Sequence, residues 1–165
     1  MTFLSKHRQV VGLFFWLLIS FTAAFIGATA TMQAKSFYNQ LTQPVFAPPS
    51  WVFGPVWSVL YTMMGVAAWL VWRSGGFKQN QISLLLFFAQ LAFNSIWSWL
   101  FFAWSLGLIA FVEILFLWIL ILSTLVTFWR THTMAGLLLI PYLLWVSFAA
   151  FLNYFLWKLN PKILG

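Results

Sequence analysis

The sequence predicts an all-α fold, an integral membrane bundle of five transmembrane helices. Of its 165 residues, 64% are hydrophobic and only 5% are charged, too few charges to cover a water-soluble domain of this size. The charges are also spaced so that long uncharged stretches remain, and a spanning helix needs roughly 20 mostly apolar residues. The medium of this chain is therefore lipid.

The uncharged stretches divide into five spans within a single membrane domain, residues 1–165. The spans are 10–30, 51–72, 82–104, 106–129 and 134–157.

The first span has two interpretations. Lys6 and Arg8 precede the apolar run, and Ala28-Thr29-Ala30 resembles a signal-peptidase site. The run over residues 10–26 is longer than the core of a typical signal peptide, so we expect the helix to be retained.

The connector at residues 31–50, called the lid segment below, is long for a helical bundle, and such loops often form lids or binding loops. Apolar and aromatic side chains alternate with polar ones along it, so we expect it to fold over one mouth of the bundle. The alternative is an interfacial segment with its aromatics at headgroup depth. The residues concerned are Phe37, Tyr38, Leu41, Val45 and Phe46, with Pro44, Pro48 and Pro49 as stiffening residues.

The second span opens with WVFGPVWSVLY, residues 51–61. If the helix begins near Gly54, Pro55 lies in its first turn, where proline is tolerated. If it begins at Trp51, Pro55 removes a backbone hydrogen bond and bends the helix.

The third and fourth spans must form a tight hairpin at Ser105-Leu106-Gly107. One helix over residues 82–129 would be about 70 Å long at about 1.5 Å per residue, against a bilayer core of about 30 Å. Residues 73–81, between the second and third spans, read as a short solvated turn with paired glycines.

The net charge of +7 is spread singly along the membrane edges, so we expect anionic lipid rather than nucleic acid as its partner. Five basic residues fall on the N-terminal side and three on the other, which weakly favours a cytoplasmic N-terminus. The first group is Lys6, Arg8, Arg73, Lys78 and Arg130, and the second is Lys35, Lys158 and Lys162.

The sequence contains few residues that could serve in acid/base catalysis or bind a metal ion. Glu113 is the one acidic residue, His7 and His132 are the two histidines, and there is no cysteine, so no acid/base pair or metal site can be assembled. An intramembrane acid such as Glu113 is a functional candidate, or it contacts water near the interface. His132 is either a haem ligand or a solvated loop residue.

Three helix faces carry aromatic and amide side chains at helical spacing. Converging, they would make an aromatic pocket with a few hydrogen-bonding groups, suited to a flat apolar ligand. Alternatively, the amides join helices and the tryptophans near span ends form interface belts. The faces are Trp57, Tyr61, Met64 and Ala68; Gln90, Asn94, Trp97 and Phe101; and Trp145, Ala149 and Asn153.

Small residues form faces on several spans and favour close helix packing or dimerisation. They are Ala23, Ala24, Gly27, Ala28 and Thr31; Gly65, Ala67 and Ala68; and Ala149 and Ala150.

Motifs along residues 38–157 resemble, in order, those of the tryptophan-rich sensory protein/translocator protein family, also called peripheral-type benzodiazepine receptors. They are Tyr38…Leu41…Pro44, Pro48-Pro49-Ser50-Trp51, Phe53-Gly54-Pro55-Val56-Trp57, Leu60-Tyr61, Met64-Gly65, Gln90-Leu91…Asn94…Trp97, Leu100-Phe101-Phe102, Pro141-Tyr142…Trp145…Phe148-Ala149 and Leu152-Asn153…Trp157.

The resemblance implies a five-helix bundle, commonly a homodimer, whose first connector covers a pocket for porphyrin, haem and related tetrapyrroles, and in many members sterols. Trp57 and Trp145 match the pocket tryptophans, which in some bacterial members are associated with light-dependent porphyrin breakdown. Other matching pocket positions are Tyr61, Gln90, Asn94, Trp97, Phe148 and Ala149, and matching lid positions are Tyr38, Pro48 and Trp51.

Two further features of the sequence bear on which ligand binds and how it is held. Leu152, Tyr154 and Lys158 fit a loose cholesterol-binding pattern, and they fit an ordinary helix end equally well. Near the lid only Lys35 is available to pair with porphyrin propionates, so binding would rest on stacking and burial more than on ion pairing.

Three functions follow as hypotheses. The first is a binding protein that senses, sequesters or delivers a porphyrin, haem or bilin, with no obligatory cofactor. The second is light-dependent porphyrin degradation through Trp57 and Trp145. The third is binding or transport of a sterol or another hydrophobic metabolite. A bacterial membrane or an organelle outer membrane would suit the chain.

Overall fold

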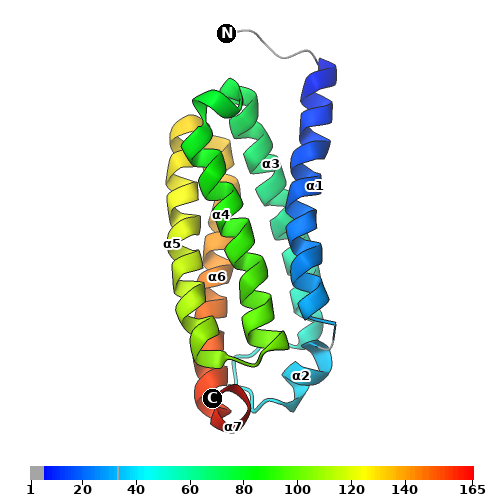
Figure 1. The fold of residues 1–165 in the computed structure, drawn as a ribbon, viewed down its shortest axis with the longest axis vertical. Coiled ribbons are helices and arrows are strands. Elements are labelled where there is room, and N and C mark those ends of the chain that lie inside the picture. Colours follow the sequence, from blue (N-terminus) through cyan, green and yellow to red (C-terminus); the bar gives the residue numbers. More distant parts are fainter. Residues whose placement is uncertain (1–5, 33) are drawn as a thin grey trace.

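The computed structural model describes residues 6–32 and 34–165, and its long helices run side by side in an elongated bundle (Figure 1). The predictions for residues 1–5 and for Gln33 of the lid segment lie outside the described residues. The helices are α1 (Lys6–Ala30), α2 (Ala34–Gln40), α3 (Phe53–Gln79), α4 (Gln81–Ser98), α5 (Gly107–Thr131), α6 (Thr133–Leu159) and α7 (Pro161–Leu164), with a 3₁₀ turn at Ser50–Val52 and a π-helical turn at Trp99–Ala103.

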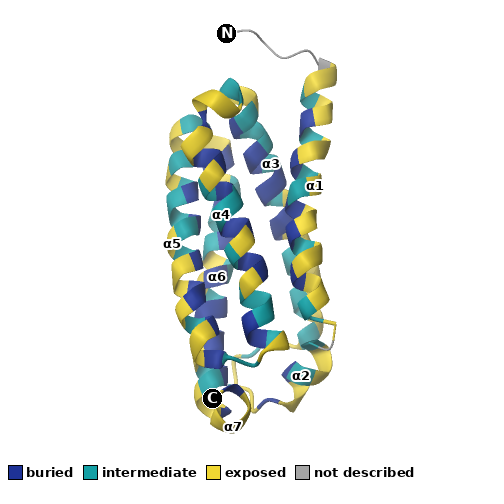
Figure 2. Ribbon diagram, in the orientation of Figure 1, coloured by how far each residue is buried: buried dark blue, intermediate teal, exposed yellow. Residues whose placement is uncertain are grey.

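Within the described residues, five helical stretches are long and apolar enough to cross a membrane, which confirms the predicted all-α bundle of five spans. Their outer faces carry large exposed hydrophobic side chains, and the buried residues line the inside of the bundle (Figure 2). Such an apolar exterior is expected where lipid is the solvent. The stretches are His7–Ala30, Ser50–Gln79, Gln81–Ala103, Gly107–Thr131 and Thr133–Leu159.

The helix α1 packs on α3 and α4, α3 also packs on α6, and α5 lies between α4 and α6. Small residues allow the close approach of α1 and α3. A Cβ atom added to Gly65 would lie 3.1 Å from the Leu17 Cα atom and 3.2 Å from the Trp16 carbonyl oxygen. Ser20 of α1 donates a hydrogen bond of 2.7 Å to the Tyr61 carbonyl oxygen of α3. The small residue Gly65 therefore serves packing within the chain.

Helix boundaries decide where the second span begins and confirm the predicted hairpin between the third and fourth spans. Because α3 begins at Phe53 after the 3₁₀ turn, Pro55 lies in the first helical turn, where its missing N–H has no intrahelical partner to lose. The hairpin at residues 105–107 is present: Ser105 takes a φ of 54°, and α5 starts at Gly107.

The turn predicted for residues 73–81 is present but shorter than predicted. The helix α3 continues past Trp72, breaks at Gly76, with φ 69° and ψ −173°, and resumes to Gln79. The Asn80 side-chain amide donates to the Val71 and Gly76 carbonyl oxygens at 3.0 and 3.1 Å and so ties the two sides of the break together. These bonds satisfy carbonyl groups that a helix end leaves free.

The lid segment packs across the end of the bundle where α4 meets α5 and where α6 ends (Figure 1). Tyr38 and Leu41 are buried there with Leu156 and Leu164. Val45 is fully exposed. Tyr38 and Leu41 therefore fix this segment to the bundle, as expected of a segment that covers its mouth.

Candidate functional site

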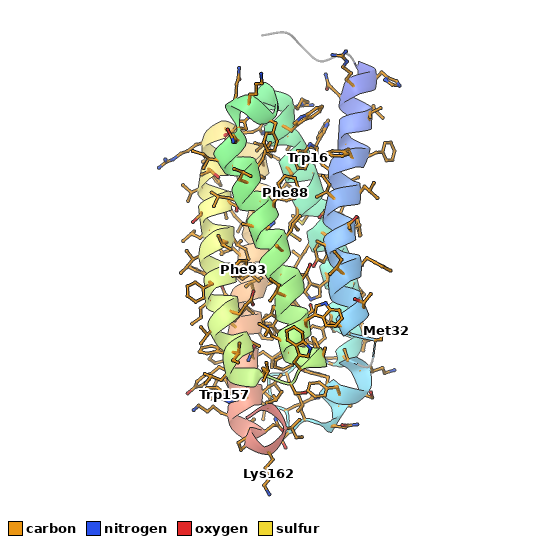
Figure 3. All side chains as sticks on the ribbon, viewed as in Figure 1. Trp16, Met32, Phe88, Phe93, Trp157 and Lys162 are labelled. Atoms are coloured by element: carbon orange, nitrogen blue, oxygen red, sulfur yellow. The ribbon has the colours of Figure 1, made fainter. Side chains whose placement is uncertain are left out.

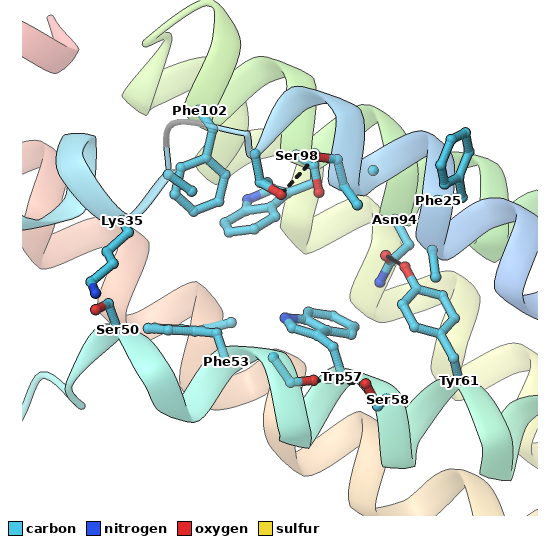
Figure 4. A pocket seen from close by; sticks show the side chains of 18 of the residues that line it. Phe25, Lys35, Ser50, Phe53, Trp57, Ser58, Tyr61, Asn94, Ser98 and Phe102 are labelled. Atoms are coloured by element: carbon cyan, nitrogen blue, oxygen red, sulfur yellow. Dashed lines mark hydrogen bonds between the residues drawn. The ribbon is translucent and has the colours of Figure 1, made fainter.

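A cavity of about 610 Å³ lies at the lid end of the bundle, between α1, α3, α4 and α6. It is called the aromatic cavity below. Eight of the predicted site residues line it, so the structure brings together side chains from four separate parts of the chain (Figure 4). These are Tyr38, Trp51, Trp57, Tyr61, Asn94, Trp97, Trp145 and Ala149.

The aromatic cavity owes its walls to the helical spacing seen in the sequence. Trp57 and Tyr61, one turn apart on α3, have ring centroids 5.6 Å apart. Across the cavity, Trp97 stacks on Phe101 with an angle of 11° between the rings. Phe53 packs edge-on to Trp145 at 6.0 Å. Each ring is held by a neighbour, which gives the cavity flat and fixed walls.

Hydrogen bonds between side chains close the inner end of the aromatic cavity. The Tyr61 hydroxyl donates to Asn94 Oδ1, and Asn94 Nδ2 donates to the Tyr142 hydroxyl at 2.9 Å. Trp97 Nε1 donates to Asn153 Oδ1 at 3.1 Å. Amides placed in a membrane bundle need such partners. Asn94 therefore fits both sequence interpretations, since it lines the cavity and also joins three helices.

The lid segment is tied down by hydrogen bonds beside the aromatic cavity. The Tyr38 hydroxyl donates to the Pro48 carbonyl oxygen at 3.0 Å, and Gln43 Nε2 donates to the Tyr38 carbonyl oxygen at 2.7 Å. Burial raises the pKa of the Tyr38 hydroxyl above its ordinary value. The buried ring also packs edge-on to Phe53 at 5.4 Å, so the lid is fixed to the start of α3.

A second tie joins the lid segment to the C-terminal end of α6. Asn160 Oδ1 accepts a hydrogen bond of 2.8 Å from the Thr42 backbone N–H. Asn160 Nδ2 donates to the Thr42 carbonyl oxygen at 2.9 Å. One side chain thereby satisfies both backbone groups of a lid residue that is 118 positions away in the sequence.

Three predicted site residues do not line the aromatic cavity. Pro48 contributes its carbonyl oxygen to the lid. Gln90 is fully buried beside Met64, with its Nε2 atom 3.8 Å from the Met64 sulfur. Phe148 lies behind the wall, with its ring 5.6 Å from that of Trp145.

The sequence interpretation missed the contribution of α1 to the aromatic cavity. Phe21 and Phe25 line it together with small residues of the same helix. These phenylalanines are also exposed on the outside of the bundle, and nothing in the sequence separates them from ordinary lipid-facing residues. The small residues Ala24, Gly27 and Ala28 were the available indication, since they leave room beside α1.

The residues of the cholesterol pattern do not share one face of α6. Leu152 is buried in the bundle, whereas Tyr154 and Lys158 are exposed. The Lys158 ammonium lies 4.1 Å from the centre of the Trp157 ring, a cation–π contact that suits a helix end at an interface. A sterol on the outer face would not reach Leu152.

Catalytic and metal-binding groups do not gather at the aromatic cavity. Among the described residues no group of three His, Cys, Asp or Glu side chains is placed to hold a metal ion. Glu113 is buried on α5, and neither carboxylate oxygen has a hydrogen-bond partner among the described residues. His132 is half-buried at the start of α6. Neither residue lines the cavity.

The sequence was compared with protein families and with known proteins. The sequence matches the model of the TspO/MBR family over residues 15–158. It is 39% identical to the tryptophan-rich protein TspO of Chlorobaculum tepidum over 158 residues, which cover 94% of this chain and 99% of the relative.

Two further relatives come from distant sources. The chain is 35% identical to the tryptophan-rich sensory protein of Cereibacter sphaeroides, covering 87% of this chain and 91% of the relative. It is 37% identical to the translocator protein of Ovis aries, covering 87% of this chain and 86% of the relative.

Proposed function

The chain belongs to the TspO/MBR family and is an integral, multi-pass membrane protein of the lipid bilayer, and from that premise we propose that it binds tetrapyrroles, namely porphyrin, haem or bilin. The observation that carries the proposal is the aromatic cavity, whose walls include Trp57 and Trp145. In this proposal the tetrapyrrole is a ligand to be sensed, sequestered or delivered, and no obligatory cofactor is required.

The size and chemistry of the cavity support a flat apolar ligand. Its volume of about 610 Å³ lies within the range of about 300–1,000 Å³ that is usual for small-molecule sites. Indole and phenol rings in fixed positions offer large flat surfaces at little cost in side-chain entropy. Stacking and burial therefore supply most of the binding free energy.

A sensory or transport role is supported by the names of two relatives, a sensory protein and a translocator protein. Both roles require reversible binding, and a lid held by a few hydrogen bonds suits reversible access.

Titration of the detergent-purified protein with protoporphyrin IX or haemin, in the dark, tests the proposal. We expect saturable quenching of tryptophan fluorescence with a shift of the Soret band. The double variant Trp57→Phe/Trp145→Phe should lose most of this effect because it removes two indole walls, whereas Trp129→Phe, outside the cavity, should keep it. Quenching that never saturates, or that survives in the double variant, would contradict the tetrapyrrole site. Competition by cholesterol would then favour the sterol alternative.

A second candidate function is light-dependent porphyrin degradation, favoured by the presence of both Trp57 and Trp145 in the same cavity wall. Dioxygen is the oxidant in this reaction: the excited porphyrin activates it, carbon–oxygen bonds form on the macrocycle as dioxygen is reduced, and no acid/base pair is needed. Illumination of the aerated complex should bleach the Soret band faster than that of free porphyrin at equal absorbance. Equal rates would leave only the binding role.

Two further proposals concern assembly and orientation. A homodimer follows from the family resemblance, and because the small-residue faces are used within the chain, its interface would lie on the large apolar side chains outside. The N-terminus is proposed to be cytoplasmic, since Arg73, Lys78 and Arg130 lie at the end of the bundle away from the lid. A mass measurement of the protein in detergent tests the first proposal.

A further inference from the structure

The aromatic cavity has one charged residue in its wall among the described residues that line it, Lys35. Lys35 lies on α2 in the lid segment, and its side chain is exposed. Figure 4 shows its ammonium group beside Ser50, at the end of the cavity away from Tyr61 and Asn94. The cavity is therefore apolar along most of its length and cationic at its lid end, which is called its mouth below.

At the inner end of the cavity, the hydrogen-bond donors of Tyr61, Asn94 and Trp97 are already used within the protein. The Tyr61 hydroxyl already donates its hydrogen bond to Asn94. The Asn94 amide donates to Tyr142, and the Trp97 indole N–H donates to Asn153. A carboxylate placed beside these three side chains would have to break their bonds or remain unpaired, and burying an unpaired charge is costly. The wall also holds the buried indole N–H of Trp145, which has no hydrogen-bond partner among the described residues. It is a neutral donor that does not compensate a full charge, so an acidic group on a ligand is disfavoured at the inner end.

Lys35 has no carboxylate side chain of its own chain to pair with. The sequence contains a single acidic residue, Glu113. Glu113 is buried on α5, a helix that contributes no residue to the cavity wall. The positive charge at the cavity mouth is thus available to a ligand.

We infer that Lys35 forms an anion-binding subsite at the mouth of the aromatic cavity, so that the preferred ligand is a flat apolar ring system carrying a carboxylate at one edge. This inference rests on the proposed function and deepens it. The ring system enters first and stacks on the aromatic walls, and the carboxylate stays beside Lys35. Such a subsite favours acidic tetrapyrroles over neutral ligands such as esters or sterols.

The subsite is tested by comparing protoporphyrin IX with its dimethyl ester, which keeps the ring and loses both charges. Both are titrated into wild-type protein, Lys35→Met and Lys35→Arg, with partition into empty micelles subtracted. The control is Lys162→Met, which removes an exposed charge at the same end of the bundle (Figure 3).

Wild-type protein should bind the acid about three- to fivefold more tightly than the ester, the range of a partly exposed ion pair. The preference should disappear in Lys35→Met, remain in Lys35→Arg and Lys162→Met, and shrink as salt rises. Equal affinity of the wild type for acid and ester, or a preference for the acid that survives in Lys35→Met, would overturn the subsite. The tetrapyrrole proposal would still stand in that case if binding were saturable and sensitive to substitution of Trp57. Absence of saturable binding for both compounds would overturn the proposed function itself.

Discussion

At the scale of single residues, two amides inside the bundle, Asn94 and Asn153, are paired with groups on other helices. Asn94 joins Tyr61 and Tyr142 on two other helices, and Asn153 joins Trp97 to the Gly107 carbonyl oxygen. Such networks fix helices against each other where no water is available. Their presence around the cavity means that the wall residues are also structural, so substitutions in the wall need controls for folding.

Tyr38 provides a prediction that depends on pH. Burial raises the pKa of its hydroxyl, so the folded protein favours the neutral form. Its contribution to stability is complete below the ordinary tyrosine pKa of about 10 and is lost as the pH rises from there through the raised value. Wild-type protein should therefore lose thermal stability above about pH 10 more steeply than Tyr38→Phe, as followed by circular dichroism.

The same substitution has a cost at neutral pH. Without the Tyr38 hydroxyl the Pro48 carbonyl oxygen loses its donor, which should cost about 1 kcal/mol. Tyr154→Phe, at an exposed tyrosine near the same end, is the matched control and should change neither result. Parallel alkaline losses in wild type and Tyr38→Phe would show that Tyr38 does not hold the lid.

The sequence predicted the aromatic wall residues better than it predicted the α1 side of the cavity. Trp57 and Tyr61, and Asn94 and Trp97, stand at helical spacing and combine an aromatic ring or an amide with a hydrogen-bonding group, so the faces that they form could be predicted. Phe21 and Phe25 could not, because a phenylalanine that faces a cavity and one that faces lipid have the same chemistry. Only the three-dimensional packing of α1 distinguishes them.

At the scale of helices, close approach through small residues sets the geometry of the bundle. Gly65 lets α3 lie against the α1 backbone at Leu17 and Trp16. Ser95 of α4 reaches the Ala23 carbonyl oxygen of α1 at 3.0 Å. The sequence predicted the faces that contain Ala23 and Gly65 but left open whether they join helices or protomers, since both contacts use the same residue types. It did not single out Ser95.

Gly65→Ala should destabilise the bundle. The added Cβ would lie 2.9 Å from Leu17 Cδ2 and 3.1 Å from the Leu17 Cα atom, so α1 must move away from α3, at a cost of about 1–3 kcal/mol. Gly54→Ala on the same helix is the matched control, because its Cβ would have no neighbour within 4 Å. Thermal unfolding in detergent should show a lower midpoint only for Gly65→Ala. Equal midpoints would mean that α1 is loosely packed.

Asn160 should act as the latch of the lid segment. Asn160→Ala leaves the Thr42 N–H and carbonyl groups without their partner, so the lid should open more often and the ligand should dissociate several-fold faster. Amide hydrogen exchange should rise in residues 41–49. Asn39→Ala, an exposed lid position, should leave both rates unchanged. Faster exchange without faster dissociation would show that the lid does not control access.

The end of α3 shows where sequence reasoning on helices fails. Paired glycines in residues 73–81 predicted a turn, and Gly76 does break the helix, but the residues on either side of it are helical, and Asn80 donates across the break to the Val71 and Gly76 carbonyl oxygens. A side-chain cap of this kind depends on the path that the chain takes after the break, which the local sequence does not contain.

At the scale of the whole molecule, the two ends of the bundle have different characters. One end carries the lid segment and α7, and the other carries the turn between α3 and α4 and the start of α1 (Figure 1). The cavity lies at the lid end. Five spans require the two ends of the chain to face opposite sides of the membrane. The side that the lid faces therefore decides the compartment from which a ligand reaches the cavity mouth.

The absence of cysteine from the sequence makes the orientation directly measurable, because one introduced cysteine is the only thiol of the protein. Asn39→Cys places it on the lid, and Ser74→Cys places it at the opposite end. Both positions are exposed, and neither substitution changes the charges that determine topology. In bacterial spheroplasts, a membrane-impermeant maleimide should label Asn39→Cys, and should label Ser74→Cys only after the membrane is broken.

That result would place the cavity mouth and Lys35 on the side away from the cytoplasm, so that a tetrapyrrole would be captured from outside. Labelling of Ser74→Cys alone in sealed spheroplasts would show the opposite orientation. The basic residues at that end of the bundle would then lie outside the cell, against the positive-inside rule. The cavity would in that case receive its ligand from the cytoplasm, where capture serves sequestration or export. Labelling of both variants only after lysis would mean that the thiols are shielded, and fusion of a reporter enzyme to each end of the chain would then determine the orientation.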